Sequence, residues 1–166
     1  MNQNNSSAVN EIFILAVKNH QQNKTDIAKN LYNQVLKINP NHIDAHNNLG
    51  IIFKNLGENE KAINCYQKAI AINPNYANAY SNLGLVFKNL GENEKAINCY
   101  QKAITINPNL VDAYNNLGII FEQLGQNQKA INSYQKAITI NPNHSNTHNN
   151  LGVIFKKLGQ NQDAIN

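Results

Sequence analysis

Two pairs of histidines have the spacing of a zinc site on one face of a helix. His42 and His46 are four residues apart, and His144 and His148 repeat that spacing, so each pair would lie on one helix face. Residues suited to packing stand at the equivalent places of the intervening segments, namely Tyr76, Tyr80, Leu110 and Tyr114. We therefore interpret the histidines as structural residues and predict no bound metal and no cofactor.

The other reactive residues do not form a catalytic set. No serine, histidine and acid recur at matched offsets, and the glycines occur singly rather than in a phosphate-binding loop. Cys65 and Cys99 are too few for a disulfide framework and lack the spacing of a zinc site. Stacked helices lie roughly 10 Å apart, which is too far for a disulfide between them. We predict a protein that is not an enzyme, with both cysteines reduced.

Asparagine is the polar residue whose number and spacing suggest a function. It accounts for 35 of the 166 residues, and four asparagines recur at equal intervals along the chain: Asn48, Asn82, Asn116 and Asn150. A carboxamide both donates and accepts hydrogen bonds, so it can pair with the N–H and C=O groups of an extended peptide whatever the sequence of that peptide. We call these four residues the asparagine ladder.

An internal repeat determines which elements position the ladder. Glycine recurs at the same interval as the ladder, from Gly50 to Gly152, and residues 43–76 are identical to residues 77–110 at 26 of 34 positions. Each unit contains two stretches with helical spacing of apolar residues, separated at a glycine such as Gly57 and ending before a proline such as Pro74. We therefore predict an all-α fold in which each unit is a hairpin of two helices.

Such a hairpin cannot bury its apolar stripe alone, so successive hairpins must stack into a solenoid. Small residues such as Gly50 and Ala69 would let the helices approach closely where they cross. The larger residues Leu49, Phe53 and Tyr66 would fill the space around them.

The repeated residues resemble the pattern of the tetratricopeptide repeat family. In residues 43–76 the pattern is carried by eight positions: His46, Leu49, Gly50, Phe53, Ala62, Tyr66, Ala69 and Pro74. The resemblance covers residues 9–166 and implies antiparallel helix hairpins in a right-handed superhelix. We expect repeats at 9–42, 43–76, 77–110 and 111–144 and a partial repeat at 145–166, after a polar, disordered leader at residues 1–8.

The two ends depart from the family pattern. The first repeat keeps Leu15 but has Ala16 in place of the glycine and Asn19 in place of the phenylalanine. Terminal repeats often diverge in this way because one side faces solvent. The fifth repeat ends a few residues into its second helix, so we expect the chain to be a fragment of a longer protein.

One face of the first helix of each repeat points away from the apolar stripe. In residues 43–76 it consists of Asp44, Asn48, Ile51 and Asn55. The equivalent residues of the following repeats are Asn78, Asn82, Leu85 and Asn89, then Asp112, Asn116, Ile119 and Gln123, then Asn146, Asn150, Val153 and Lys157. The family resemblance implies that this face, which we call the asparagine face, lines a concave groove. We predict that it binds peptide, with the aliphatic residue beside each rung giving apolar contact.

The ladder also resembles the one in the tetratricopeptide arm of the O-linked N-acetylglucosamine transferases, which implies a groove that holds extended polypeptides by their backbone. Rungs roughly 10 Å apart would meet every third residue of a chain that advances about 3.3 Å per residue. A second use of the family, capture of the C-terminal carboxylate of a chaperone, needs basic residues that are missing here. Asn78, Asn82, Asp112 and Asn116 stand at those positions.

Three alternatives remain open. Asparagine is so common that duplication of a biased composition also explains the ladder, and the first repeat has Ile14 in place of a rung. The chain could be the substrate-recruiting arm of a larger glycosyltransferase-like enzyme. It could also be a scaffold that assembles end to end, because the partial fifth repeat would leave Ile131, Tyr134 and Ile138 incompletely covered.

Charge and hydropathy limit the partners. The net charge of +4 comes from lysines that are scattered among acids, so we predict no nucleic-acid partner. No apolar run approaches the roughly 18 residues of a membrane span, and residues 1–7 lack the features of a secretory signal. We therefore predict no membrane partner and a cytoplasmic location. The expected partner is a protein or peptide in an extended conformation, with a homo-oligomer formed by end-to-end stacking as a further possibility.

Overall fold

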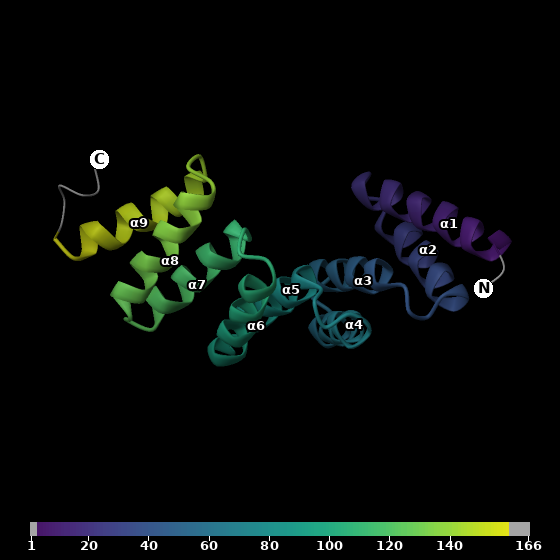
Figure 1. Cartoon of the computed structure of the whole chain (residues 1–166), viewed down its shortest axis with the longest axis horizontal. Helices are drawn as coiled ribbons and strands as arrows, with labels where there is room; N and C mark the ends of the chain where they lie inside the picture. The colour runs from purple at the N-terminus through teal and green to yellow at the C-terminus, as the bar shows by residue number, and fades with distance from the viewer. Residues whose placement is uncertain (1–2, 160–166) are drawn as a thin grey trace. The chain divides into compact units, whose positions relative to one another are not determined.

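The computed structural model describes residues 3–159, and all regular structure in this range is helical (Figure 1). Nine helices lie within the described range: α1 (Gln3–Gln21), α2 (Thr25–Ile38), α3 (Ile43–Asn55), α4 (Asn59–Ile72), α5 (Ala77–Asn89), α6 (Asn93–Ile106), α7 (Val111–Gln123), α8 (Asn127–Ile140) and α9 (Ser145–Lys157). No helix among these is long and apolar enough to cross a membrane.

The helices form two compact units, the first ending at Val86 and the second beginning at Phe87, so the boundary falls within α5. In the first unit, α1 pairs with α2 and α3 with α4 as hairpins, and α2 packs against α3. In the second unit, α7 pairs with α8, while α6 packs against α7 and α8 against α9. The predicted all-α fold of stacked helix hairpins is confirmed.

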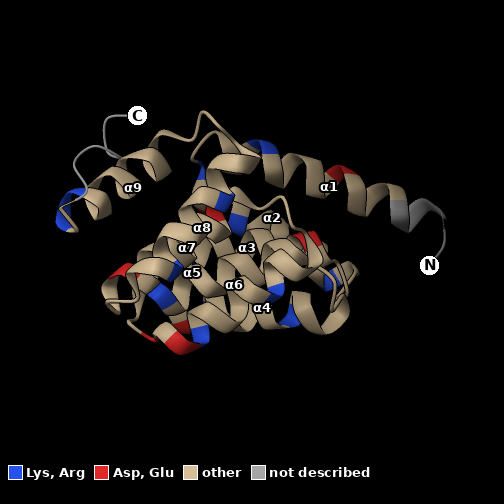
Figure 2. Ribbon diagram, turned by 60° about the vertical axis from the view of Figure 1, so that its left-hand side comes forward, with Lys and Arg blue, Asp and Glu red and all other residues tan. Residues whose placement is uncertain are grey.

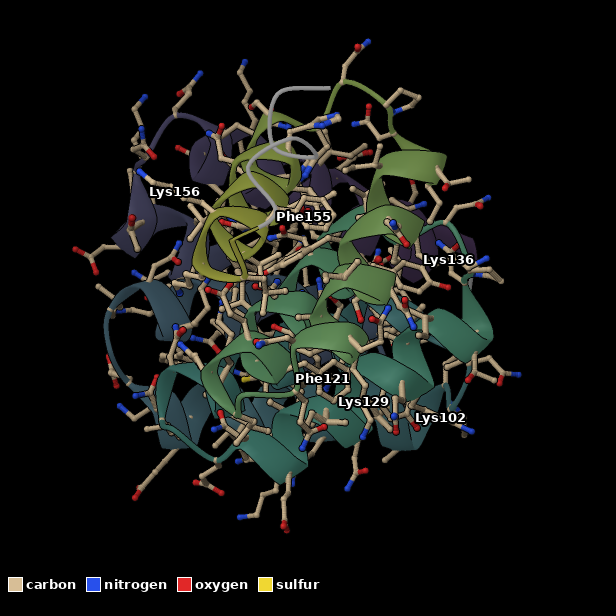
Figure 3. The ribbon with its side chains drawn as sticks, turned by 90° about the vertical axis from the view of Figure 1, so that its left-hand side faces the viewer. Lys102, Phe121, Lys129, Lys136, Phe155 and Lys156 are labelled. Atoms are coloured by element: carbon tan, nitrogen blue, oxygen red, sulfur yellow. The ribbon has the colours of Figure 1, made fainter. Side chains whose placement is uncertain are left out.

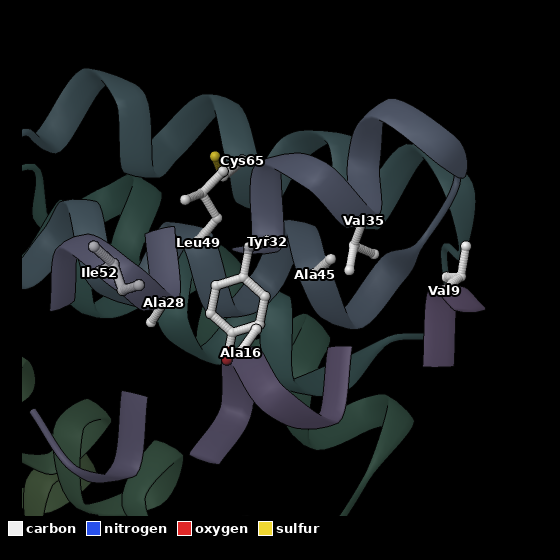
Figure 4. Close-up of a cluster of buried hydrophobic side chains, with 9 residues drawn as sticks. All are labelled: Val9, Ala16, Ala28, Tyr32, Val35, Ala45, Leu49, Ile52 and Cys65. Carbon is white, nitrogen blue, oxygen red and sulfur yellow. The ribbon is translucent and has the colours of Figure 1, made fainter. Parts of the chain in front are cut away.

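A fully buried tyrosine lies in the second helix of each complete repeat, at Tyr32, Tyr66, Tyr100 and Tyr134. In the first unit, Tyr32 lies among small and branched side chains that include Ala16, Ala28 and Val35 (Figure 4). A Cβ atom added at Gly50 would lie 2.6 Å from Cε1 of Tyr66, so the predicted close approach at this glycine is confirmed.

Asparagines also build the turns between repeats. The backbone N–H of Asn75 donates a 2.9 Å hydrogen bond to Oδ1 of Asn73, which is extended (φ −132°, ψ 98°) as the residue before Pro74. The same turn recurs at the equivalent places of the other repeats, at Asn39, Asn107 and Asn141. Part of the asparagine content therefore has a structural cause.

The ends differ from the sequence-based expectations. Helix α1 begins at Gln3, so residues 3–8 are helical where we expected a disordered leader. Leu15 is 48% exposed, whereas Leu49 at the equivalent position is 5% exposed. The reason is that Leu49 belongs to the core shared with the preceding hairpin, and no described helix covers Leu15 in that way.

The expected gap in the core beside the fifth repeat is wrong for two of its three residues. Ile131 and Tyr134 are buried, because α9 packs on α8 and places the buried Ile154 in the same apolar cluster. Ile138 is half-buried. One helix of the fifth repeat is therefore enough to cover most of this surface.

Candidate functional site

The ladder residues are hydrogen-bonded across the repeats. Nδ2 of Asn82 in α5 donates a 2.9 Å hydrogen bond to Oδ1 of Asn47 in α3. In the second unit, Nδ2 of Asn150 in α9 donates a 3.0 Å hydrogen bond to Oδ1 of Asn115 in α7. In both units a rung is thus bound to the residue that precedes the previous rung.

The acceptors of these bonds are buried carboxamides, with Asn47 5% and Asn115 9% exposed. Asn115 accepts a second hydrogen bond of 3.0 Å, from Oγ1 of the fully buried Thr147. Within the described residues, no hydrogen bond engages Oδ1 of Asn82 or Asn150 or their second amide hydrogen. Each of these two side chains therefore has one carbonyl oxygen and one N–H free to bind a ligand. The hydrogen bond to the buried asparagine fixes its orientation.

The other two rungs have different partners. Nδ2 of Asn48 donates to the hydroxyl of Tyr32 at 3.3 Å, because Phe13 in the first repeat stands where later repeats have a polar residue. Oδ1 of Asn116 accepts a 2.7 Å hydrogen bond from Nζ of Lys88, whose pKa is lowered by burial. The four rungs therefore have different hydrogen-bond partners, although they recur at equal intervals along the sequence.

The aliphatic neighbours are only partly available. Ile51, Leu85 and Ile119 are half-buried, whereas Val153 is 49% exposed. Each of them can still offer apolar contact beside its rung. The remaining amides of this face, Asn55, Asn78, Asn89, Gln123 and Asn146, are exposed.

The two aspartates of the face contact the last residue of their own repeat, which immediately precedes the first helix of the next repeat. The hydroxyl of Tyr76 donates a 2.7 Å hydrogen bond to Oδ1 of Asp44, and burial together with this carboxylate raises the pKa of Tyr76. In the second unit, Nε2 of His144 lies 3.4 Å from Oδ1 of Asp112. Both aspartates therefore hold the residue that leads into the next repeat.

Hydrogen bonding of the buried tyrosine hydroxyls depends on the residue near the end of the first helix of the same repeat. The hydroxyl of Tyr134 donates a 3.2 Å hydrogen bond to Glu122, which also pairs with Lys157 at 2.5 Å. Lysine stands at the equivalent positions Lys54 and Lys88. The hydroxyls of Tyr66 and Tyr100 have no hydrogen-bond partner among the described residues.

The buried carboxamides of Asn47 and Asn115 were not predicted from the sequence. Their only signal is asparagine at equivalent positions of the second and fourth repeats, with Ser81 in the repeat between them. A polar residue next to a rung is normally interpreted as part of a solvent-exposed helix surface. Whether it is buried depends on the distance between stacked repeats, which the sequence does not reveal.

His42, His46 and His148 make hydrogen bonds to backbone groups at the repeat junctions. Nε2 of His46 donates to the carbonyl of Pro40 at 2.8 Å, and His148 makes the same bond to Pro142. The ring of His42 accepts a 3.2 Å hydrogen bond from the N–H of Ala45 and so caps α3. The described residues contain no cluster of three or more potential metal ligands.

Both cysteines are free thiols. Burial raises the pKa of each to about 11, so neither is a reactive thiolate at neutral pH. Lysines and acidic residues are scattered over the ribbon in the view of Figure 2, consistent with the pattern along the sequence.

Family models of the repeat match most of the chain. The model described as TPR repeat matches residues 52–91 and 87–125, and models described as tetratricopeptide repeat match residues 31–64, 111–144 and 133–166. The chain belongs to the tetratricopeptide repeat family. The models describe the repeat itself, and none of them points to the O-linked N-acetylglucosamine transferases in particular. A search of curated proteins found no match.

Solved structures of tetratricopeptide repeat proteins share the fold. A crystal structure of MamA is 29% identical, with a TM-score of 0.80, over 90% of this chain and 88% of that one. PilF of Pseudomonas aeruginosa is 23% identical, with a TM-score of 0.88, over 95% and 72%. MamA of Desulfovibrio magneticus RS-1, from residue 41 to the end, is 20% identical, with a TM-score of 0.82, over 95% and 89%.

Proposed function

We propose that this tetratricopeptide repeat protein binds extended peptide segments along its asparagine face. Tetratricopeptide repeats imply a module for protein–protein interaction, and the asparagine face is where we place the contact. The proposal depends on one repeated observation, the hydrogen bond from Asn82 to Asn47 and its counterpart from Asn150 to Asn115.

This bond orients the ladder before a peptide arrives. A free asparagine side chain must be immobilised when it binds, at a cost of roughly 0.5–1.5 kcal/mol. At Asn82 and Asn150 part of that cost is met during folding. Each oriented carboxamide offers one N–H and one C=O, which is the set of groups needed to pair with a peptide unit.

Neighbouring side chains set what else the face recognises. Within each unit, the aliphatic residues of the face would contact apolar side chains of a bound peptide. These residues are Ile51 and Leu85 in the first unit and Ile119 and Val153 in the second. Lys88, hydrogen-bonded to Asn116, would favour a carbonyl or carboxylate near that rung. Because most contacts would be with the backbone, the side-chain preference of the face is broad.

Binding to an array of short unstructured peptides tests the proposal. Asn82→Ala combined with Asn150→Ala removes two oriented rungs and should weaken binding by about tenfold. Asn98→Ala combined with Asn30→Ala is the matched control, since both residues are exposed asparagines on second helices. Equal binding by the ladder variant and the control would contradict the proposal, provided that circular dichroism shows both variants folded.

The backbone-binding face would also suit the substrate-recruiting arm of a glycosyltransferase-like enzyme. That narrower use rests on the likeness of the ladder residues alone. Fusion of the chain to a reporter glycosyltransferase would test it. If the asparagine face recruits the substrate, the ladder variant should lower modification of an unstructured substrate more than the control variant does.

A second candidate function is self-assembly. Ile14, Leu15 and Ile27 in the first hairpin are 66%, 48% and 51% exposed, and exposed apolar side chains would offer contact to another chain. Sedimentation over a concentration series should then show an oligomer, and the substitution Leu15→Glu should dissociate it into monomers. A monomer at all concentrations would exclude this function.

A further inference from the structure

The first unit has an open cavity of about 760 Å³ on the side away from the asparagine face. Its lining comes from α2, α3, α4 and the turn at Pro40. On α3 the lining residues are His46, Leu49 and Phe53. At 3.6 residues per turn these three residues point nearly opposite to Asn48 and Ile51, so the cavity is separate from the proposed peptide-binding face.

The floor of the cavity is apolar and its edge is polar. Leu36, Leu49, Phe53 and Ile72 supply the apolar surface, and the edge carries Asn33, Asn41 and Asn64. A volume of several hundred Å³ is typical of a ligand site that takes a few side chains. The asparagines offer donors and acceptors around an apolar centre.

The charge of the cavity is entirely positive. Lys37, Lys61 and Lys68 line it, and the lining contains no carboxylate. Nζ of Lys61 lies 5.4 Å from the centroid of the Phe53 ring and pairs with Glu58, which lies outside the lining. No ion pair engages Lys37 or Lys68 within the part of the chain that the structure describes.

The field of Lys68 reaches two other lining residues. Burial raises the pKa of Cys65 to about 11, and the Lys68 ammonium opposes that rise. Burial also lowers the pKa of His46, and Lys68 lowers it further. The Lys68 ammonium therefore acts on the interior of the cavity as well as on solvent.

We propose that this cavity binds an acidic peptide segment that carries an apolar side chain between two acidic residues. The apolar side chain fits the floor, and the carboxylates pair with lysines at the edge. Lys61 and Lys68 are seven residues apart on one helix, which places them about 10 Å apart along its axis. An extended peptide spans that distance in about three residues, whereas a single compact anion cannot meet both lysines.

The second unit provides a natural comparison. Its equivalent positions keep two of the lysines, Lys129 and Lys136, and Lys129 lies over Phe121 at 5.5 Å as Lys61 lies over Phe53 (Figure 3). Several of the other cavity residues are replaced, among them Lys37 by Thr105, His46 by Tyr114 and Cys65 by Ser133. Leu49, Phe53 and Asn64 are kept, as Leu117, Phe121 and Asn132. Lys136 therefore shares the repeat position of Lys68 without the same surroundings.

Charge reversal at these two positions tests the proposal. The probe is a labelled unstructured peptide with two glutamates three residues apart and leucine and phenylalanine between them, titrated with the full chain. We expect Lys68→Glu to weaken binding by about tenfold or more and Lys136→Glu to change it by less than about twofold. Equal loss in both variants would show attraction by net charge alone and would overturn the proposal. Unchanged binding of the same peptide with glutamine for glutamate would also overturn it.

Alkylation of the two thiols of the unaltered protein shows where the peptide binds. Cys65 lines the cavity and Cys99 does not, and both have a pKa of about 11. The peptide should slow alkylation of Cys65 relative to Cys99, measured by mass spectrometry of the two labelled fragments. Equal protection of both thiols, or protection of neither, would contradict binding in this cavity. The readout does not involve the asparagine ladder, so this proposal and the proposed function can fail separately.

Discussion

The hydrogen bond from Nδ2 of Asn82 to Oδ1 of Asn47 joins the asparagine face to a buried interface. Asn47 is 5% exposed and belongs to the contact between repeats, whereas Asn82 belongs to the asparagine face. The same relationship recurs between Asn150 and Asn115 in the second unit. The ladder is therefore part of the packing between repeats as well as a candidate binding surface.

Removal of a buried carboxamide should destabilise the second unit. Asn115→Ala leaves Asn150 and the fully buried Thr147 without a shared acceptor, so the free energy of unfolding should fall by about 1–3 kcal/mol. Asn149 holds the same repeat position but is exposed, so Asn149→Ala should stay within about 0.5 kcal/mol of the unaltered protein. Urea denaturation measures both, and equal effects would show that the burial of Asn115 has no energetic role.

The glycines at the helix crossings should differ by repeat. A Cβ at Gly50 would lie 2.6 Å from the ring of Tyr66, so Gly50→Ala should lower the free energy of unfolding by about 1–3 kcal/mol. A Cβ at Gly152 meets no atom of the described residues within 4 Å. There the higher helix propensity of alanine should raise stability by about 0.5–1 kcal/mol. Two substitutions with the same sign would refute the packing argument.

The buried tyrosine hydroxyls should also differ. Tyr134→Phe removes a hydrogen bond to Glu122 and should cost about 1 kcal/mol. Tyr66→Phe removes a buried hydroxyl that has no partner among the described residues, so it should be neutral or stabilising. Thermal denaturation of the two variants distinguishes these outcomes, and a larger loss in Tyr66→Phe would mean that its hydroxyl is bonded in solution.

The first unit should lose stability in mild acid. Burial lowers the pKa of His20, His42 and His46 below the usual value of 6.5. The unfolded chain therefore binds protons before the folded one, and stability present above pH 6.5 is lost as the pH falls toward the folded pKa values. His46→Tyr introduces the residue that stands at the equivalent positions Tyr80 and Tyr114, and it should reduce this loss. The loss is measured as the change in the urea midpoint between about pH 7.5 and about pH 5. If the midpoints of the unaltered protein and of His46→Tyr changed equally with pH, His46 would not contribute to the loss.

The fold was predictable because its determinants are local and repeated. The spacing of Tyr66 and Gly50 and the proline at Pro74 are visible in the sequence, and each has a direct structural consequence. The inter-repeat bonds were not predictable, because the burial of Asn47 depends on how closely two repeats stack. The partners of the rungs likewise depend on single exceptions such as Phe13 and Lys88, which the repeat pattern conceals.

If Asn82 and Asn150 bind the peptide backbone, methylation of the backbone nitrogens of the ligand should weaken binding. A peptide that binds the unaltered protein would be compared with the same peptide carrying N-methyl groups at every third residue, and with a version whose side chains are scrambled. We expect N-methylation to lower affinity by about tenfold or more and scrambling to have a small effect. Retained affinity after N-methylation, with loss on scrambling, would contradict backbone binding and would show that side chains are recognised instead.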